Sequence, residues 1–273
     1  IGLKVSKSFV DRTLKEAGMV KSPQKKRKGL SKYMKYPQRT LTKIGKSMMS
    51  IDFIGPKYLQ GSNEGVSFLS CKYIRPQKQG IVKRVNGQTT EQTIKILKEI
   101  WKDNPIPDVI KADNDSAFGA NLSHDKCIGK LVLFFLNLGV TPLYVAPRSP
   151  WNNGENEGFN SVFSKKFWNK LQFTDEDEID IKIKDFNIAY EKYSNLIFDN
   201  PNNNSAKYIN EFKNINLENK HVKNFKTQII YFLRIVRRKN EKGSDKEYGF
   251  IEILNQEIKM PKKLINLFVF CAL

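Results

Sequence analysis

The chain has 273 residues, enough for one sizeable hydrophobic core and one or two small additional domains. Its formal net charge is +19, and its cysteines, Cys71, Cys127 and Cys271, are odd in number and isolated, which excludes a disulfide framework and a zinc ribbon. His124 and His221 are the two histidines, so a zinc module of paired histidines and cysteines is excluded as well. No apolar run reaches the roughly 20 residues of a membrane span, and we expect a protein of a reducing, cytoplasmic compartment.

The positive charge is confined to the two ends of the chain. Residues 1–46 carry 14 Lys and Arg against 2 Asp and Glu, residues 47–219 carry 21 of each, and residues 220–273 carry 12 against 5. Heavy use of lysine would explain a basic chain but not this segregation. Because contacts to phosphates supply salt-sensitive affinity, a neutral middle with basic ends predicts binding to nucleic acid.

The first predicted element is a short amphipathic helix. Ser6 precedes a stretch in which apolar residues recur at helical spacing from Phe9 to Ala17, and Gly18 is a stop signal. The pattern is equally consistent with an ordinary helix and with the recognition half of a helix-turn-helix. Lys21–Lys46 then reads as an extended basic linker. We therefore treat residues 1–46 as a partial helix-turn-helix and linker.

The middle of the chain alternates between β-like and helical segments. In chain order we predict strands at Met48–Gly55, Val66–Ile74 and Gln79–Val85, a helix at Thr89–Lys102, a strand at Val109–Ala112, a helix around Asp125–Leu138, a strand at Val140–Val145 and a helix from about Gly154 to Leu171. Phe163 and Phe167 share one face of the last helix and are predicted to be core. Asp175–Glu178 is predicted to be a solvated helix start. This order is typical of an α/β fold with a mixed sheet.

The C-terminal part is predicted to be β-rich. Gln228–Val236 is strongly β-like, and Tyr248–Leu254 and Glu257–Met260 flank a turn at Asn255-Gln256. The pattern predicts a linker at residues 201–220 and a small antiparallel β-barrel at residues 221–273. The tail Leu264–Leu273 is either the last strand or a frameshifted end.

Three acidic residues lie in distinctive local sequences. Asp52 lies in MMSIDFIGP, Asp113 in VIKADNDSAF and Glu157 in PRSPWNNGENEGFN. The first two lie in or just after short β-branched runs, and the third opens a helix-like segment. Carboxylates from separate elements are the ligands that hard cations such as Mg²⁺ require, and two such ions can hold the attacking and leaving oxygens of a phosphoryl displacement. We therefore predict phosphodiester chemistry.

These segments resemble the DDE transposases and retroviral integrases, in particular the transposases of bacterial insertion sequences. Asp113–Phe118 is similar to the D-N-G-x-x-F segment of that family, Leu138–Thr141 and Pro147–Trp151 are similar to the strand and loop before its last acid, and Asn153–Glu157 matches N-G-x-x-E. The resemblance covers about Met48 to Ile209. It implies an RNase H-like integrase catalytic core at residues 47–200, whose catalytic triad and metal ligands are Asp52, Asp113 and Glu157.

The resemblance also implies a function. A member of this family binds transposon ends, cleaves a phosphodiester to free a 3′-hydroxyl and joins that hydroxyl to target DNA with two Mg²⁺ or Mn²⁺ ions. The implied partners are double-stranded DNA and further copies of the chain on it, with no membrane, in the bacterial nucleoid. The helix near the N-terminus and the C-terminal barrel are similar to DNA-binding parts of such enzymes. Candidate DNA contacts are Lys7, Arg12, Lys25, Lys26, Arg27, Lys28, Arg148, Asn153, Lys165, Lys166, Arg237 and Arg238.

Two features depart from the family pattern. The 43 residues between Asp113 and Glu157 are more than is usual, and an insertion around Gly119–Lys130 would account for them. Asp115 stands where the family has Gly, and if that turn requires a positive φ, Asp tolerates it at a modest cost. Two other functions stay open: an RNase H-like nuclease without strand transfer, and a decayed or domesticated DNA-binding protein.

Glu155 and Glu157 compete for the role of third acid. Two residues subtend about 200° on a helix, so both cannot face one metal site. The resemblance selects Glu157. Glu155 is then expected to favour only the positive end of the helix, and its carboxylate is expected to be dispensable for catalysis.

Overall fold

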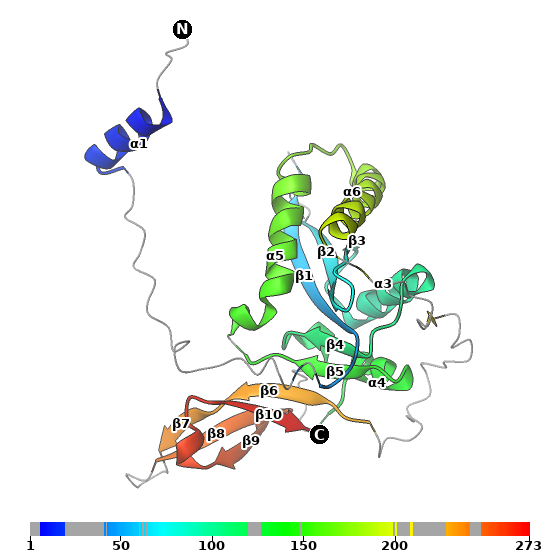
Figure 1. The fold of residues 1–273 in the computed structure, drawn as a ribbon, viewed down its shortest axis with the longest axis vertical. Helices are drawn as coiled ribbons and strands as arrows, with labels where there is room; N and C mark the ends of the chain where they lie inside the picture. Colours follow the sequence, from blue (N-terminus) through cyan, green and yellow to red (C-terminus); the bar gives the residue numbers. More distant parts are fainter. Residues whose placement is uncertain are drawn as a thin grey trace. The chain divides into compact units, whose positions relative to one another are not determined.

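The computed structural model describes residues 6–19, 41, 43–59, 61, 63, 65–119, 127–147, 149–198, 200, 208–209, 228–240 and 247–273. The chain forms two compact units, Ile1–Lys35 and Tyr36–Leu273, and each is considered by itself (Figure 1). The predicted basic segment Lys25–Lys28, Arg148 and the linker at residues 201–220, apart from 208–209, lie outside the described residues.

The first unit contains the helix α1, Lys7–Glu16. The side chain of Ser6 caps it by accepting a hydrogen bond from the Phe9 amide at 3.2 Å. The predicted helix is thus confirmed. Its apolar side chains are exposed, with Phe9 at 52% and Leu14 at 37%. A second helix is not among the described residues of this unit, so the helix-turn-helix is not confirmed.

The second unit is built on a seven-stranded mixed sheet. Its strands are β1 (Met48–Tyr58), β2 (Gly65–Arg75), β3 (Gly80–Val85), β4 (Val109–Ala112), β5 (Thr141–Tyr144), β6 (Tyr231–Ile235) and β10 (Phe268–Ala272), in the spatial order β10-β6-β5-β4-β1-β2-β3. β2 and β3 run antiparallel to their neighbours, whereas β1, β4, β5 and β6 are parallel. The order β3-β2-β1-β4-β5 with these directions is compatible with an RNase H-like core.

Helices cover both faces of this sheet (Figure 1). One face packs against α3 (Thr90–Asp103) and α4 (Lys130–Asn137), through a cluster that includes Trp101, Phe134 and Met49. The other face packs against α5 (Gly154–Phe163), the π-helix η4 (Ser164–Trp168) and α6 (Glu176–Ile197), through a second cluster around Phe163 and Phe167. The two phenylalanines are therefore core residues, as predicted.

The predicted barrel at residues 221–273 is not confirmed, because the described C-terminal strands belong to two sheets. β6 and β10 pair with each other and extend the large sheet, while β7 (Arg237–Asn240), β8 (Glu247–Ile253) and β9 (Gln256–Met260) form a separate three-stranded sheet. The tail is accordingly a strand, preceded by the short 3₁₀ helix η7 (Lys262–Leu264). β8 and β9 turn at Leu254 and Asn255, both at positive φ, one residue before the predicted turn.

Further differences lie at element ends. The predicted helix from Asp125 begins at Lys130 in the described part of the chain, and residues 120–126 of the proposed insertion lie outside it. Asp115 has a φ of −64° and caps the 3₁₀ helix η2 (Ser116–Phe118), so the positive φ considered for this turn is not present there. No helix among the described residues is long and apolar enough to cross a membrane.

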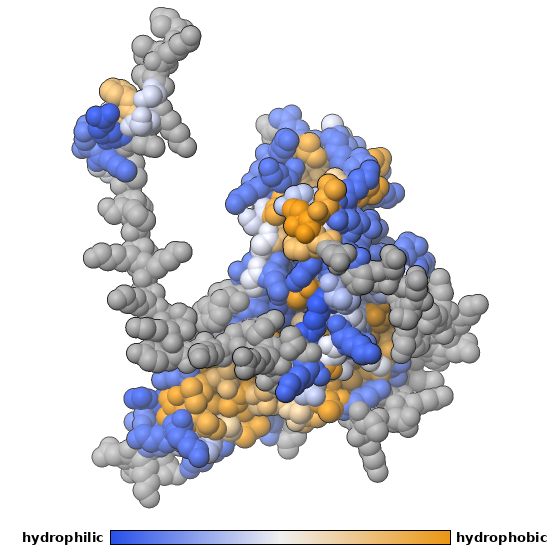
Figure 2. Space-filling view, viewed as in Figure 1, coloured by the Kyte–Doolittle hydropathy of each residue, from blue (hydrophilic) through white to orange (hydrophobic). Residues whose placement is uncertain are grey.

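Apolar side chains gather on the surface over the C-terminal strands (Figure 2). The exposed apolar residues in the C-terminal part of the chain include Ile229, Leu267 and Leu273. The C-terminal segment therefore presents apolar surface as well as basic side chains.

Two glycines, one on the sheet against α5 and one on an open side of α5, provide a test of how closely this helix packs on the sheet. A Cβ on Gly80 of β3 would lie 2.4 Å from the Phe159 ring of α5, whereas a Cβ on Gly158 would meet nothing within 4 Å. We expect Gly80→Ala to lower the free energy of unfolding by about 1–3 kcal/mol, because α5 must move. Gly158→Ala is expected to raise it by about 0.5–1 kcal/mol through helix propensity. Chemical denaturation of both variants checks this, and equal effects would contradict the close packing.

Candidate functional site

The site is organised by the register of β1 with its two neighbours. Ser50 on β1 is paired with Lys72 on β2 and with Lys111 on β4. Two residues further along β1, Asp52 is paired with Ser70, and Asp113 follows Lys111 by the same interval just beyond the end of β4. Because alternate residues of a strand share a face, these side chains form two adjacent rows, one with two lysines and one with two aspartates.

The helix α5 lies across both rows. The 3₁₀ helix η3 (Pro150–Asn153) leads into it, and the Ser50 hydroxyl donates a hydrogen bond to Asn153 Oδ1 at 2.7 Å. One turn further, the Ser70 hydroxyl donates to Asn156 Oδ1 at 3.4 Å. The helix is thereby held by polar contacts over the rows and by Phe159 and Phe163 over the apolar cluster beyond them.

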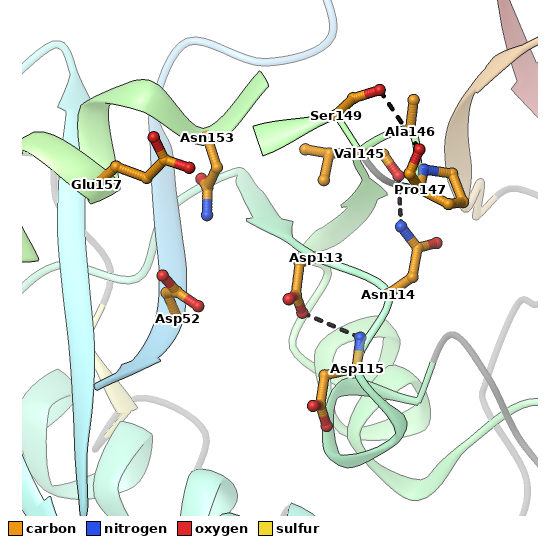
Figure 3. A pocket seen from close by; sticks show the side chains of 10 residues that line it. All are labelled: Asp52, Asp113, Asn114, Asp115, Val145, Ala146, Pro147, Ser149, Asn153 and Glu157. Atoms are coloured by element: carbon orange, nitrogen blue, oxygen red, sulfur yellow. Dashed lines mark hydrogen bonds between the residues drawn. The ribbon is translucent and has the colours of Figure 1, made fainter. Parts of the chain in front are cut away.

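The three predicted acids line one cavity. Asp52 comes from β1, Asp113 from the loop after β4 and Glu157 from α5, and Figure 3 shows their side chains around the same space. The cavity has a volume of about 460 Å³. Its remaining lining residues are Asn114, Asp115, Val145, Ala146, Pro147, Ser149 and Asn153. A space of this size, open to solvent and bordered by four acidic side chains, favours a cationic or cation-bound occupant.

The carboxylates of the cavity repel one another. Desolvation, followed by repulsion from Asp113, raises the pKa of Asp52 to about 6, and Glu157 adds a smaller repulsion. The Asn160 amide opposes this shift by donating to Asp52 Oδ2 at 2.9 Å. Desolvation also raises the pKa of Asp113, against a hydrogen bond from the Asp115 amide at 3.0 Å.

A shared carbonyl forms the wall beside Asp113. The Val145 oxygen accepts hydrogen bonds from Asn114 Nδ2 at 2.6 Å and from Arg234 Nη1 at 3.2 Å. Arg234 belongs to β6 and is 5% exposed, and its Nε also donates to the Glu252 carbonyl at 2.7 Å. The C-terminal strands are in this way joined to the rim of the cavity.

The donor set fits a divalent cation by its chemistry. Asp52, Asp113, Asp115 and Glu157 bring carboxylate oxygens to the cavity, and its lining contains no cationic side chain among the described residues. Oxygen ligands of this kind suit Mg²⁺ or Mn²⁺. Within the described residues, however, no group of three or more His, Cys, Asp and Glu side chains is arranged closely enough to hold a metal ion as it stands.

Glu155 and Glu157 face different surroundings. Glu157 lines the cavity, whereas Glu155 Oε2 lies 3.4 Å from Lys111 Nζ and its Oε1 lies 4.0 Å from Lys78 Nζ. The sequence-based expectation that Glu155 interacts only with the helix end is not what the structure shows, because this side chain is paired with a buried lysine.

The other candidate DNA contacts are dispersed. Asn153 borders the cavity, with its side-chain nitrogen directed into it (Figure 3), and Lys165 and Lys166 are exposed on η4. Arg237 and Arg238 lie on β7 and form ion pairs with Glu252 at 3.8 Å and Glu247 at 2.6 Å. Arg12 is exposed on α1, which also contains Lys7.

Three residues of the site were missed in the sequence. Asn160 lies three residues after Glu157 and so on the same helix face, and Lys111 lies two before Asp113 on the same strand face, so spacing alone would have indicated both. Arg234 reaches the cavity wall from 89 residues beyond Val145, and no local pattern indicates such a contact.

Comparisons with known proteins give limited similarity. No protein-family model and no curated protein sequence matches the chain. Among solved structures, the chain is similar to one in the cryo-EM structure of the simian T-cell lymphotropic virus intasome in complex with PP2A regulatory subunit B56 gamma, with 12% identity, a TM-score of 0.43, and coverage of 81% of this chain and 78% of that chain.

Titration of the carboxyl groups tests whether the charges of Asp52 and Asp113 interact. In the metal-free protein we expect Asp113→Asn to lower the pKa of Asp52 below its value of about 6, because a repelling charge is removed. Asn160→Ala is expected to raise it, because the charged form no longer accepts a hydrogen bond from this side chain. Carbon-detected NMR titration of the aspartate carboxyls measures both shifts. An Asp52 pKa unchanged by Asp113→Asn would show that the two side chains do not interact.

Proposed function

We propose that this chain is a metal-dependent DDE recombinase that cleaves the ends of a transposable DNA element and joins the freed 3′-hydroxyl to target DNA. The observation that carries the proposal is the convergence of Asp52, Asp113 and Glu157 on one cavity, from the strand, strand end and helix expected for them. The segregated charge of the sequence supports a polyanionic substrate. The strand order of the large sheet supports the same kind of catalytic core.

The residues of the chain would act by positioning and by electrostatics. Asp52, Asp113 and Glu157 would hold two Mg²⁺ or Mn²⁺ ions, which when bound lower the pKa of the attacking water or hydroxyl and stabilise the leaving 3′-oxygen. Asn160 orients Asp52 by donating to its carboxylate. Asn153 is anchored to Ser50 through its oxygen, which leaves its nitrogen to donate to a phosphate oxygen.

The basic ends would hold the DNA while the cavity acts on it. The same proposal places the protein in a bacterial cytoplasm with its nucleoid, working as a multimer, because two element ends and a target must be held together. Arg148 lies between two lining residues in the sequence, and Lys165 and Lys166 lie eight and nine residues after Glu157. All three are proposed to contact the DNA backbone near the scissile phosphate.

Neutralising the acids tests the active site. We expect Asp52→Asn, Asp113→Asn and Glu157→Gln each to reduce cleavage by at least 10³-fold, because each removes a hard anionic ligand, while DNA affinity stays within about twofold. The assay is incubation with Mg²⁺ and labelled duplexes from the DNA that flanks the coding sequence, followed by separation of nicked and joined products. Wild-type cleavage by any of the three variants would remove that residue from the site.

The same assay distinguishes the alternatives. Nicked products without joined products would identify an RNase H-like nuclease, and binding without either would identify a DNA-binding protein that has no catalytic activity. One observation favours the latter: the described carboxylates are not arranged to hold a metal ion as they stand. Joined products from the wild-type protein would exclude both.

The basic N-terminal segment is expected to contribute much of the DNA affinity. Changing Lys25, Lys26, Arg27 and Lys28 together to Gln should reduce the slope of log K against log salt concentration by about 0.9 for each phosphate that the variant no longer neutralises. Fluorescence anisotropy with a labelled duplex at several salt concentrations measures the slope. The control, which removes three positive charges where the test variant removes four, changes Lys95, Lys98 and Lys102 of α3 to Gln, in the neutral part of the chain. Equal slopes for the two variants would contradict binding by the segment.

A further inference from the structure

The row of side chains at the level of Ser50, next to the row of aspartates on the same face of the sheet, contains two buried lysines. Lys72 is 7% exposed and Lys111 is 3% exposed, on opposite sides of Ser50. Desolvation lowers the pKa of both, and for Lys72 to about 8. A buried ammonium group is costly unless it is paired and hydrogen-bonded, so the contacts of each lysine indicate what the fold has arranged around it.

The two lysines have different partners. Lys72 Nζ donates to the Tyr190 hydroxyl at 3.0 Å and lies 4.7 Å from the centre of the same ring, so α6 accommodates it. Lys111 Nζ instead lies 3.1 Å from the Asn152 carbonyl oxygen and 3.4 Å from Glu155 Oε2. Lys111 therefore holds both a backbone carbonyl of η3, which leads into α5, and a side chain of the first turn of α5.

Glu155 is the counter-charge of this row. Its attraction favours the protonated form of both Lys72 and Lys111, and its other oxygen lies 4.0 Å from Lys78 Nζ. Its side chain is 47% exposed, so the carboxylate remains in contact with solvent. Glu155 therefore neutralises lysines that are buried, although it is not buried itself.

This contact determines which acid of α5 faces the cavity. Glu155 and Glu157 lie about 200° apart around the helix. A rotation of the first turn of α5 would move Glu157 away from the cavity and leave it without its third carboxylate, although the burial of Phe159 and Phe163 fixes the helix beyond that turn. The hydrogen bond to the Asn152 carbonyl and the Ser50–Asn153 bond oppose that rotation at the start of the helix.

We propose that Lys111 is a positioning residue, which through its ion pair with Glu155 and its hydrogen bond to Asn152 fixes the first turn of α5 and keeps Glu157 directed at Asp52 and Asp113. This inference rests on the proposed function, since it assigns Lys111 a role in assembling the metal site. Lys111 itself does not touch substrate or metal.

The test compares metal binding with fold stability. The variants are Lys111→Met, Glu155→Gln and the double variant, and the control is Lys130→Met, which breaks an exposed pair with Glu91 at the same 3.4 Å distance. Calorimetric titration of the full-length protein with Mn²⁺ gives the affinity, and thermal unfolding without metal gives the stability. If Lys111→Met does not fold, Glu155→Gln, which keeps size and a hydrogen-bond acceptor at a half-exposed position, provides the same test.

We expect each single variant to bind Mn²⁺ at least tenfold more weakly than the wild type, with Lys130→Met unchanged. The double variant should recover thermal stability, because Lys111 is no longer left as an unpaired buried charge, but not Mn²⁺ affinity, because the first turn of α5 has lost its ion pair with the sheet. Wild-type affinity in both single variants, or affinity that recovers together with stability, would overturn the positioning role alone. Failure of the wild-type protein to bind Mn²⁺ would overturn the proposed function and this role with it.

Discussion

The register between β1 and its two neighbours is the constraint on which the site depends. It places Ser50 between Lys72 and Lys111, and it places Asp52 beside Ser70 with Asp113 at the end of the next strand. A shift of β1 by one residue would direct Asp52 into the apolar layer beneath α3 and α4 and bring an apolar side chain to the cavity. Ile51 and Met49, which are fully buried on that opposite face, oppose such a shift, so the apolar core on one side of the sheet holds the carboxylates in place on the other.

Burial of charge explains why α5 must be held so closely. Two lysines and two aspartates share one face of the sheet between two apolar clusters, and every ion there costs free energy unless it is paired. The protein supplies an anion to the lysine row, in the form of Glu155, whereas the lining of the cavity supplies no cation to the aspartate row. Among the described residues of the cavity lining the second row has no cationic partner, and this asymmetry supports the proposal of a bound cation.

The sequence indicated the parts of the fold that have a local cause. Strand and helix periodicity placed β1, β4 and α5 within a few residues, and the turn chemistry around Asn153 marked where the third acid enters. It did not indicate that the C-terminal strands divide between two sheets, since β6 joins β5 across a long interval and pairing of that kind is decided by packing. The pairing of Glu155 with Lys111 was missed because the two residues are 44 positions apart in the sequence, and no local pattern indicates that β4 lies beneath α5.

Ion pairs within the fold reduce the positive charge that remains available for binding a polyanion. At the C-terminus, Arg237, Arg238 and Lys239 of β7 are each paired with a glutamate of β8 or β9, so their field is weaker than the net charge of that segment suggests. The N-terminal segment differs, since its 14 basic residues have 2 acidic residues to pair with within residues 1–46. Counterion release depends on cations that meet phosphates rather than carboxylates. The two basic ends are therefore not equivalent: under the proposed function the N-terminal one would supply salt-dependent affinity, while the C-terminal one, joined through Arg234 to the wall of the cavity, would orient the DNA with respect to the carboxylates.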